Sequence, residues 1–135
     1  MDIPTLEKNS LIELRDQAKE LGITRANRLK KEDLLIIISQ AEAEKQGREV
    51  RGGILEIMNE GVGFLRSEHY QGGPGDVYVS QTQIRRYGLR NGDLIIGEAR
   101  PPRESEKHFG LVKVESVNGQ DPEQVAKEQT PELFA

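Results

Sequence analysis

Apolar residues near the start of the chain recur at the intervals expected for a helix. Between residues 10 and 21 they are three or four residues apart, so they share one helical face. Ser10 and Glu13 match a capping box, in which both side chains satisfy backbone N–H groups of the first turn. Gly22 follows as a left-handed C-terminal cap. These features predict a helix over residues 10–21, with an apolar face made by Leu11, Leu14, Ala18 and Leu21.

A second helix is predicted to begin at Lys30 or Lys31. Its five consecutive apolar residues, 34–38, are also compatible with a buried strand. The Lys-Lys-Glu-Asp sequence before them and the Ala-Glu-Ala-Glu-Lys sequence after them are strongly helix-forming, so the helix is favoured. With a short helical turn over residues 5–9, this segment makes a helical unit that ends near residue 47.

From Gly52 onward, apolar and polar residues alternate, as they do in strands. Ser80 and Gln83 form a second capping pattern, which predicts a short helix up to Tyr87 that is closed by Gly88. This helix falls between the third and fourth of five predicted strands, which is the layout of an OB-fold (cold-shock-like) barrel. The predicted strands cover residues 54–59, 63–67, 76–79, 93–99 and 109–117, separated by glycine and proline clusters at 72–75 and 100–103.

The fold class is therefore α+β, a small helical subdomain followed by a five-stranded barrel. We assign residues 1–47 to the helical unit, residues 52–118 to the barrel and residues 119–135 to an acidic linker. The last segment has one basic residue against four acidic ones and contains two prolines, which is typical of a connector.

Charge and composition narrow the function. The chain has 19 Lys and Arg against 23 Asp and Glu, and three of the four excess negative charges lie in the linker. The balanced remainder argues against tight non-specific binding to duplex nucleic acid, which depends on neutralising phosphates. The absence of Cys excludes disulfides and thiolate metal sites, and a mean hydropathy of −0.64 with no long apolar run predicts no membrane span. Without a signal-peptide pattern, a cytoplasmic protein is expected.

Two neighbouring strands place aromatic and charged side chains on the same predicted face. Alternation directs Phe64 and Arg66 outward from the second strand, and Asp76 and Tyr78 outward from the third. Aromatic residues are scarce here, with three Phe, three Tyr and no Trp in 135 residues. Because unpaired bases offer a flat π-surface and a polar edge, this combination predicts binding of single-stranded RNA.

The charged pair favours one base. An Arg can donate to N3 and O2 of cytosine while an Asp accepts from its amino group, whereas the same Asp would face O4 of uracil unfavourably. Arg66 and Asp76 therefore predict a preference for cytosine, with Phe64 as the stacking platform. The alternative interpretation is an ordinary cross-strand salt bridge, which contributes little energy at a surface.

Glu106 and His108 form a second candidate cluster, at the entrance to the last strand. The apolar phase slips downstream of them, which predicts a β-bulge at Gly110. A functional interpretation puts Glu106 and His108 beside Tyr78 as walls of a second base pocket, whereas their spacing alone favours an ordinary solvated hairpin. Candidate phosphate contacts are Arg85, Arg86, Arg103 and Lys107.

The order of motifs resembles the N-terminal half of the bacterial transcription termination factor Rho family. The motifs are Gly53-Ile-Leu-Glu-Ile, Gly61-Val-Gly-Phe-Leu-Arg, Gly75-Asp-Val-Tyr-Val-Ser, Gln83-Ile-Arg-Arg-Tyr and Arg100-Pro-Pro-Arg. The resemblance implies a hexameric, ATP-driven RNA translocase that loads on cytosine-rich transcripts and dislodges RNA polymerase.

The resemblance also implies roles for individual residues. Phe64 would stack on the cytosine, Arg66 and Asp76 would read its edge, and Tyr78 and Glu106 would enclose the preceding base. Two positions depart from the family pattern: Val62 replaces an aromatic residue, and His108 stands where a Tyr is common. These departures imply weaker or pH-dependent binding.

Catalysis by this chain is not expected. No Gly-x-x-x-x-Gly-Lys-Ser/Thr phosphate loop occurs in the sequence, and His69 and His108 lack metal-ligand spacing. We therefore expect no enzyme activity and no cofactor. The resemblance implies an N-terminal fragment or a freestanding module, monomeric by itself, whose partners are single-stranded cytosine-rich RNA and the motor domain of a longer chain.

A rival hypothesis places binding in the helical segment. Arg25, Arg28, Lys30 and Lys31 would contact duplex DNA or a regulatory protein, with the barrel as a scaffold. Cations at the start of a helix oppose its dipole, which mildly favours a role for them in binding a partner.

Overall fold

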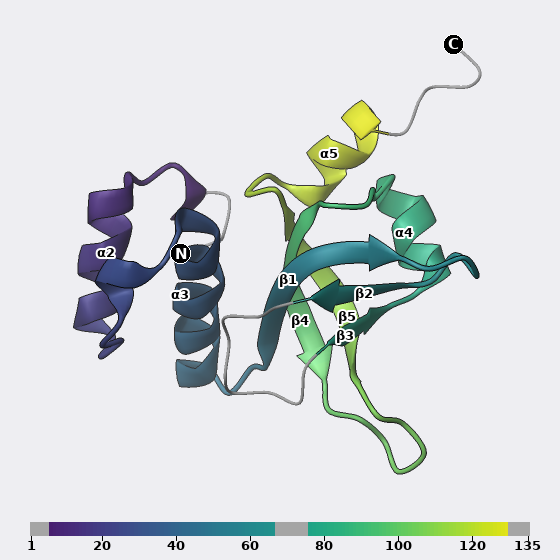
Figure 1. The fold of residues 1–135 in the computed structure, drawn as a ribbon, viewed down its shortest axis with the longest axis horizontal. Coiled ribbons are helices and arrows are strands. Elements are labelled where there is room, and N and C mark those ends of the chain that lie inside the picture. The colour runs from purple at the N-terminus through teal and green to yellow at the C-terminus, as the bar shows by residue number, and fades with distance from the viewer. Residues whose placement is uncertain (1–5, 67–75, 130–135) are drawn as a thin grey trace.

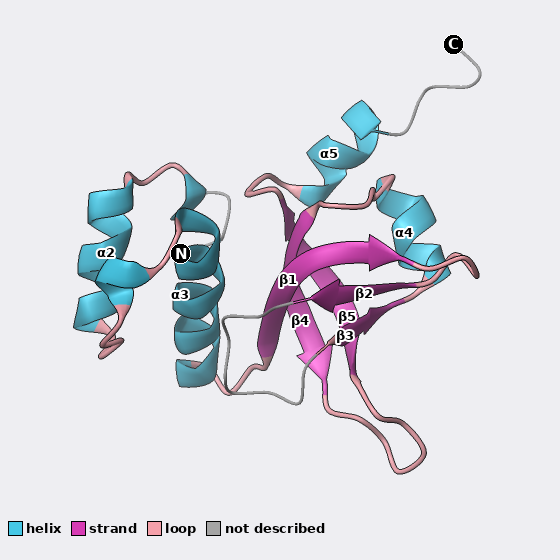
Figure 2. Ribbon diagram, in the orientation of Figure 1, coloured by secondary structure: helices cyan, strands magenta, loops and turns pink. Residues whose placement is uncertain are grey.

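The computed structural model describes residues 6–66 and 76–129 (Figure 1). Several predicted features lie outside these residues: residues 1–5 of the helical unit, residue 67 at the end of the second strand, His69, the glycine-rich cluster 72–75 and residues 130–135 of the expected linker. Within the described part, a helical unit lies beside a β-barrel, as Figure 2 shows.

The helical unit consists of α2 (Leu11–Glu20), the 3-10 helix η1 (Ala26–Arg28) and α3 (Lys31–Lys45). The capping box at α2 is confirmed: Ser10 Oγ accepts a hydrogen bond from the Glu13 backbone, and Glu13 Oε1 accepts one from the Ser10 backbone. Gly22 has a φ of 86° and ends α2 as predicted. Both predicted helices are thus confirmed.

The apolar run in α3 is buried against two neighbours. Leu34, Leu35, Ile36 and Ile38 are all 2% exposed or less and share one core with α2. That core also contains Val50, Leu94 and Ile96 of the barrel. Because α3 packs on α2 and on the barrel, it needs apolar residues on more than one face, which explains why its sequence also fits a buried strand.

The barrel has five strands in the closed order β1-β2-β3-β5-β4. Helix α4 (Gln81–Tyr87) lies between the third and fourth strands, and the predicted OB-fold layout is confirmed. All strand pairs are antiparallel except β3 with β5. The strands are β1 (Val50–Ile57), β2 (Gly63–Arg66), β3 (Val77–Val79), β4 (Leu94–Arg100) and β5 (Phe109–Val117).

Strand β4 is buried on both faces. Ile95 points into the barrel core, while its neighbours Leu94 and Ile96 pack in the core shared with α3. On the adjacent strand, a Cβ at Gly52 would lie 3.0 Å from the side chains of both Ile36 and Ile96. The helical unit therefore packs directly on the wall formed by β1 and β4.

The phase slip in β5 is present, but its predicted position at Gly110 is wrong. Gly110 pairs regularly with Arg100 and Tyr78, and the register shifts come further along, where β5 has extra residues opposite β4. Val112 is 54% exposed between the buried Leu111 and Val114. Because Val112 points outward at the bulge, Leu111 and Val114 both reach the core. The position of the bulge is therefore set by core packing and not by Gly110.

Part of the segment expected to be a linker is helical. Helix α5 (Pro122–Gln129) begins after Asp121, whose carboxylate accepts a hydrogen bond from the Glu123 backbone at 2.8 Å. Val125, which is 4% exposed, packs against the barrel core and holds the helix there. Val125 thus docks a mostly polar helix on the barrel, and the role of residues 119–135 as a linker stays a prediction.

Candidate nucleic-acid interface

The register of β2 and β3 brings the predicted aromatic residues together. Phe64 pairs directly with Tyr78, while Leu65 pairs with Val77 on the inner face. Leu65 and Val77 are 1% and 2% exposed, whereas Tyr78 is 39% exposed. The Phe64 and Tyr78 rings meet edge to face with centroids 5.9 Å apart. The alternation predicted for both strands is confirmed.

His108, just before β5, brings a third ring into contact with Phe64. Parallel pairing of β3 with β5 aligns Val77 with Phe109, which places the preceding residue beside the β2–β3 surface. The His108 and Phe64 ring centroids are 5.1 Å apart, and the planes are inclined by 65°. We call Phe64, Tyr78 and His108 the aromatic cluster.

Arg66 lies beside this cluster between two carboxylates. Its Nε donates a hydrogen bond to Glu56 Oε1 at 2.6 Å, and its Nη1 donates to Asp76 Oδ2. The hydrogen bond to Glu56 is the main cause, and that to Asp76 a further one, of a raised pKa at Arg66. The guanidinium carbon lies 5.4 Å from the centroid of the Phe64 ring. The predicted Arg66–Asp76 pair is therefore present next to the aromatic cluster.

Glu106 is held by a different arginine. Arg100 donates two hydrogen bonds to its carboxylate, at 2.7 and 3.0 Å, and the backbone N–H of Arg103 donates a third at 3.0 Å. The hydrogen bonds from Arg100 are the largest cause of a pKa lowered to about 2, followed by that from the Arg103 backbone. No described contact joins Glu106 to Tyr78, so its place in a second pocket stays a prediction.

Two charged residues of this surface were missed by the sequence analysis. Glu56 is an outward residue of β1 that pairs in register with Phe64, and Arg100 is the last residue of β4. The alternation of β1 was a signal for Glu56. Arg100 was treated only as part of a loop, because its pairing with Glu106 depends on the fold of the 101–108 segment.

The four candidate phosphate contacts fall in two places. Arg103 and Lys107 are exposed in the segment that carries Glu106 and His108. Arg85 and Arg86 are exposed on α4. The described contacts of Arg86 run to Glu123 of α5, at 3.5 Å, and to the Tyr87 ring, at 5.2 Å. Among the described contacts, Arg86 is linked to α5 and not to the aromatic cluster.

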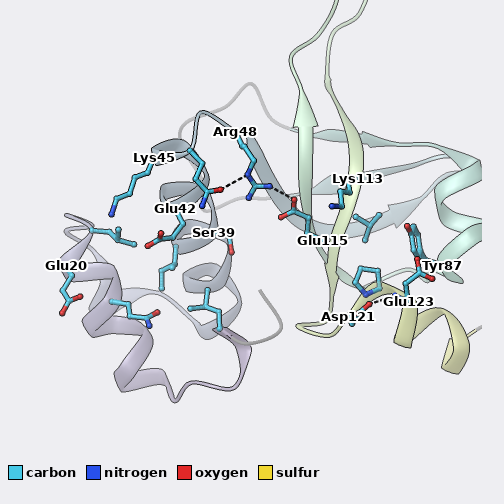
Figure 3. Close-up of a pocket in the computed structure, with 17 residues that line it drawn as sticks. Glu20, Ser39, Glu42, Lys45, Arg48, Tyr87, Lys113, Glu115, Asp121 and Glu123 are labelled. Carbon is cyan, nitrogen blue, oxygen red and sulfur yellow. Dashed lines mark hydrogen bonds and ion pairs between the residues drawn. The ribbon is translucent and has the colours of Figure 1, made fainter. Parts of the chain in front are cut away.

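A cleft of about 910 Å³ lies elsewhere, between the helical unit and the barrel (Figure 3). Arg48 lies at this cleft and binds Glu115 at 2.8 Å. The cleft carries acidic and basic side chains from α3, β5 and the start of α5. Neither the aromatic cluster nor the basic residues at 25, 28, 30 and 31 line it. The cleft therefore supports neither the predicted face nor the rival hypothesis.

Other kinds of site find no support within the described residues. No three side chains among His, Asp and Glu in residues 6–66 and 76–129 are grouped so that they would hold a metal ion. None of the helices in these ranges is both long enough and apolar enough to cross a membrane.

The closed five-stranded barrel has the OB-fold layout, and its outward face carries aromatic and charged side chains. Comparison with protein families identifies it further: the model for the Rho termination factor RNA-binding domain matches residues 51–123, and that for the Rho N-terminal domain matches residues 5–47. The chain therefore belongs to the Rho transcription termination factor family, and the resemblance noted in its motifs is confirmed.

Individual relatives agree with this assignment. The chain is similar to the transcription termination factor Rho of Pseudomonas aeruginosa, with 43% identity over 91% of this chain. It shares 44% identity with Rho of Bacillus subtilis over 96% of this chain, and 45% with Rho of Aquifex aeolicus over 95%. In each case it spans about 30% of the length of the relative, namely the RNA-binding region near the N-terminus.

Proposed function

We propose that the face around Phe64 binds single-stranded RNA with a preference for cytosine, as the RNA-loading site of a Rho factor. The observation that carries this proposal is the Arg66–Asp76 pair beside the Phe64 ring. It places hydrogen-bond donors and an acceptor next to a stacking platform, as recognition of an unpaired base requires.

Stacking supplies the affinity in this proposal. Neither neighbouring ring stacks in parallel on Phe64, because both meet it at angles of 65° or more. A base that stacks on Phe64 gains roughly 1–3 kcal/mol. This term does not depend on net charge, which fits a domain with nearly equal numbers of acidic and basic residues.

Base edges supply the specificity. Among the described residues, Glu56 and Asp76 accept from Nε and Nη1 of Arg66, so the guanidinium has further Nη hydrogens and Asp76 a second carboxylate oxygen with which to meet a base. Donors beside an acceptor complement N3, O2 and the amino group of cytosine. Uracil presents an acceptor where cytosine has its amino group, so the same pair disfavours it.

The neighbouring base would occupy a pocket bordered by Tyr78, His108 and Glu106. Tyr78 and His108 both approach Phe64, and Glu106 is held two residues before His108 by Arg100. Arg103 and Lys107 would contact phosphates at this end of the face. Arg85 and Arg86 would contact RNA only where its path extends beyond the aromatic cluster.

The wider role is also a proposal, since the relatives are about three times longer than this chain. We infer that the domain works within a hexameric, cytoplasmic transcription termination factor, where an ATP-driven motor domain moves the RNA that this face captures. By itself the chain would be a monomer that binds RNA without a cofactor and without catalysis.

The rival hypothesis for the helical segment gains little support. Lys31 binds Glu7 at 3.2 Å, so one of the four basic side chains is engaged within the protein. The match to an RNA-binding domain falls on the barrel and not on this segment.

Binding to labelled oligo(C) and oligo(U) RNA, measured by fluorescence anisotropy at fixed salt, tests the proposal. We expect tighter binding to oligo(C), loss of that preference in Arg66→Ala and weaker binding to both in Tyr78→Ala. The matched control is Arg28→Ala, which removes one positive charge from the helical unit. Equal binding of both oligonucleotides by the unmodified chain, unchanged in Arg66→Ala and Tyr78→Ala and weakened only in Arg28→Ala, would indicate that the helical segment is the binding site.

A further inference from the structure

Arg66 is fixed from three strands at once. It ends β2, Glu56 is on β1 and Asp76 directly precedes β3. Glu56 accepts from Nε at 2.6 Å and Asp76 accepts from Nη1, so the two carboxylates bind adjacent parts of one guanidinium. Glu56 also pairs in register with Phe64, which puts it on the same outward face as the stacking ring.

These two carboxylates have different effects on the free donors of Arg66. A guanidinium carries its N–H groups in a rigid plane, so a bond at Nε sets the orientation of the Nη groups. Asp76 accepts from Nη1, which lies on the edge of the guanidinium that would face a base. Glu56 accepts from Nε alone and takes up none of the Nη hydrogens.

We propose that Glu56 is a positioning residue that determines specificity for cytosine, because it holds the Arg66 guanidinium in the orientation in which the Nη groups and Asp76 present a single edge. This role rests on the proposed function of the face. Without Glu56, the long Arg66 side chain samples other rotamers, and part of its donor pattern is lost before a base arrives.

The opposite effect is also physically reasonable and gives the proposal its test. A carboxylate beside an RNA site repels phosphate, and it also competes with the base for the same arginine. If competition dominated, Glu56→Ala would tighten RNA binding without changing base preference. If positioning dominates, the preference for cytosine over uracil falls although a negative charge has been removed.

Three variants separate these effects. Glu56→Ala removes the acceptor and the charge, Glu56→Gln keeps an oxygen that accepts from Arg66 Nε, and Glu60→Ala removes an exposed negative charge just beyond β1. The Glu56 side chain is 55% exposed, so we expect all three variants to fold, which circular dichroism verifies.

Anisotropy titrations with oligo(C) and oligo(U) give the ratio of the two dissociation constants. We expect the dissociation constant for oligo(U) divided by that for oligo(C) to fall by about three- to fivefold in Glu56→Ala. This is the scale of one exposed ion pair. We expect Glu56→Gln to restore most of this ratio and Glu60→Ala to change both constants equally. An unchanged ratio in Glu56→Ala would overturn the role of Glu56 while leaving the proposed function intact.

The state of Arg66 without RNA provides a second readout. In NMR spectra of the free protein, we expect the Arg66 Nε–H signal to exchange slowly with water in the unmodified chain and in Glu56→Gln, and rapidly in Glu56→Ala. Equal exchange in all three would overturn the proposal. If the unmodified chain bound both oligonucleotides equally, the proposed function itself would fail, and the role of Glu56 with it.

Discussion

Phe64 and His108 meet edge to face, with ring centroids 5.1 Å apart, although one lies on the second strand and the other precedes the fifth. This contact draws the segment that carries Glu106 towards the β2–β3 surface. The aromatic cluster therefore depends on long-range pairing as well as on local alternation.

Replacing Phe64 by Ala should weaken RNA binding more than it affects the fold. Loss of one stacking ring costs roughly 1–3 kcal/mol of binding free energy, which is about 5- to 150-fold in the dissociation constant for oligo(C). Ile12→Ala is the control, because Ile12 is 71% exposed on α2 and remote from the barrel face. Unchanged binding in Phe64→Ala would show that the ring is not the platform.

The Glu106 carboxylate should remain charged in strongly acidic solution. Its pKa in the folded protein is about 2, against an ordinary value of 4.5. The ion pair therefore stabilises the fold fully at pH values above 4.5, and this stabilisation is lost as the pH falls from 4.5 towards 2. Carboxyl carbon shifts followed by NMR should show the low midpoint. In Arg100→Gln the midpoint should move back towards the ordinary range, and no movement would disprove the pairing.

Adding a methyl group at Gly53 should disturb the strand that carries Arg66. A Cβ there would lie 2.6 Å from the Arg66 carbonyl oxygen, so β1 and β2 must separate in Gly53→Ala. We expect a loss of roughly 1–3 kcal/mol in unfolding free energy, measured by urea denaturation. Gly110→Ala is the matched control, since the nearest atoms to its Cβ belong to the Arg100 side chain at 3.5 Å. Equal stability of both variants would contradict this packing.

The helical unit and the barrel should unfold together. Ile96 of β4 is fully buried in the core shared with α3, so Ile96→Ala should cost roughly 2–5 kcal/mol and destabilise both units. Amide hydrogen exchange should accelerate at Leu35 and at Val79 alike, whereas Val112→Ala, at an exposed position, should change neither. Acceleration confined to the barrel would mean that the units are independent.

Local signals in the sequence predicted most of the fold. The capping pairs Ser10–Glu13 and Ser80–Gln83 set the starts of two helices as expected. The strands were harder where their limits depend on partners: β1 begins at Val50, earlier than predicted, because it pairs with Glu98 of β4. Such pairing leaves no mark in the sequence of either strand alone.

In the candidate site, too, the contacts within one hairpin were predictable and the contacts with other segments were not. Alternation placed Phe64 beside Tyr78, since both belong to one hairpin. Glu56 was missed because its partner Arg66 is on another strand, and Arg100 because its partner Glu106 lies in the segment between β4 and β5. The bulge was expected at Gly110, but it lies near Val112, where it allows Leu111 and Val114 both to be buried in the core.

The parallel pairing of β3 with β5 affects when the face that carries the aromatic cluster is assembled. Adjacent hairpins such as β1–β2 and β2–β3 form between near neighbours in the chain, whereas β3 must wait for β5 across the whole of α4 and β4. Loop-closure entropy makes such distant contacts late and slow. The contact between β3 and β5 therefore forms after the β1–β2 and β2–β3 hairpins, so a nascent chain gains its complete face only after β5 has been synthesised and docked.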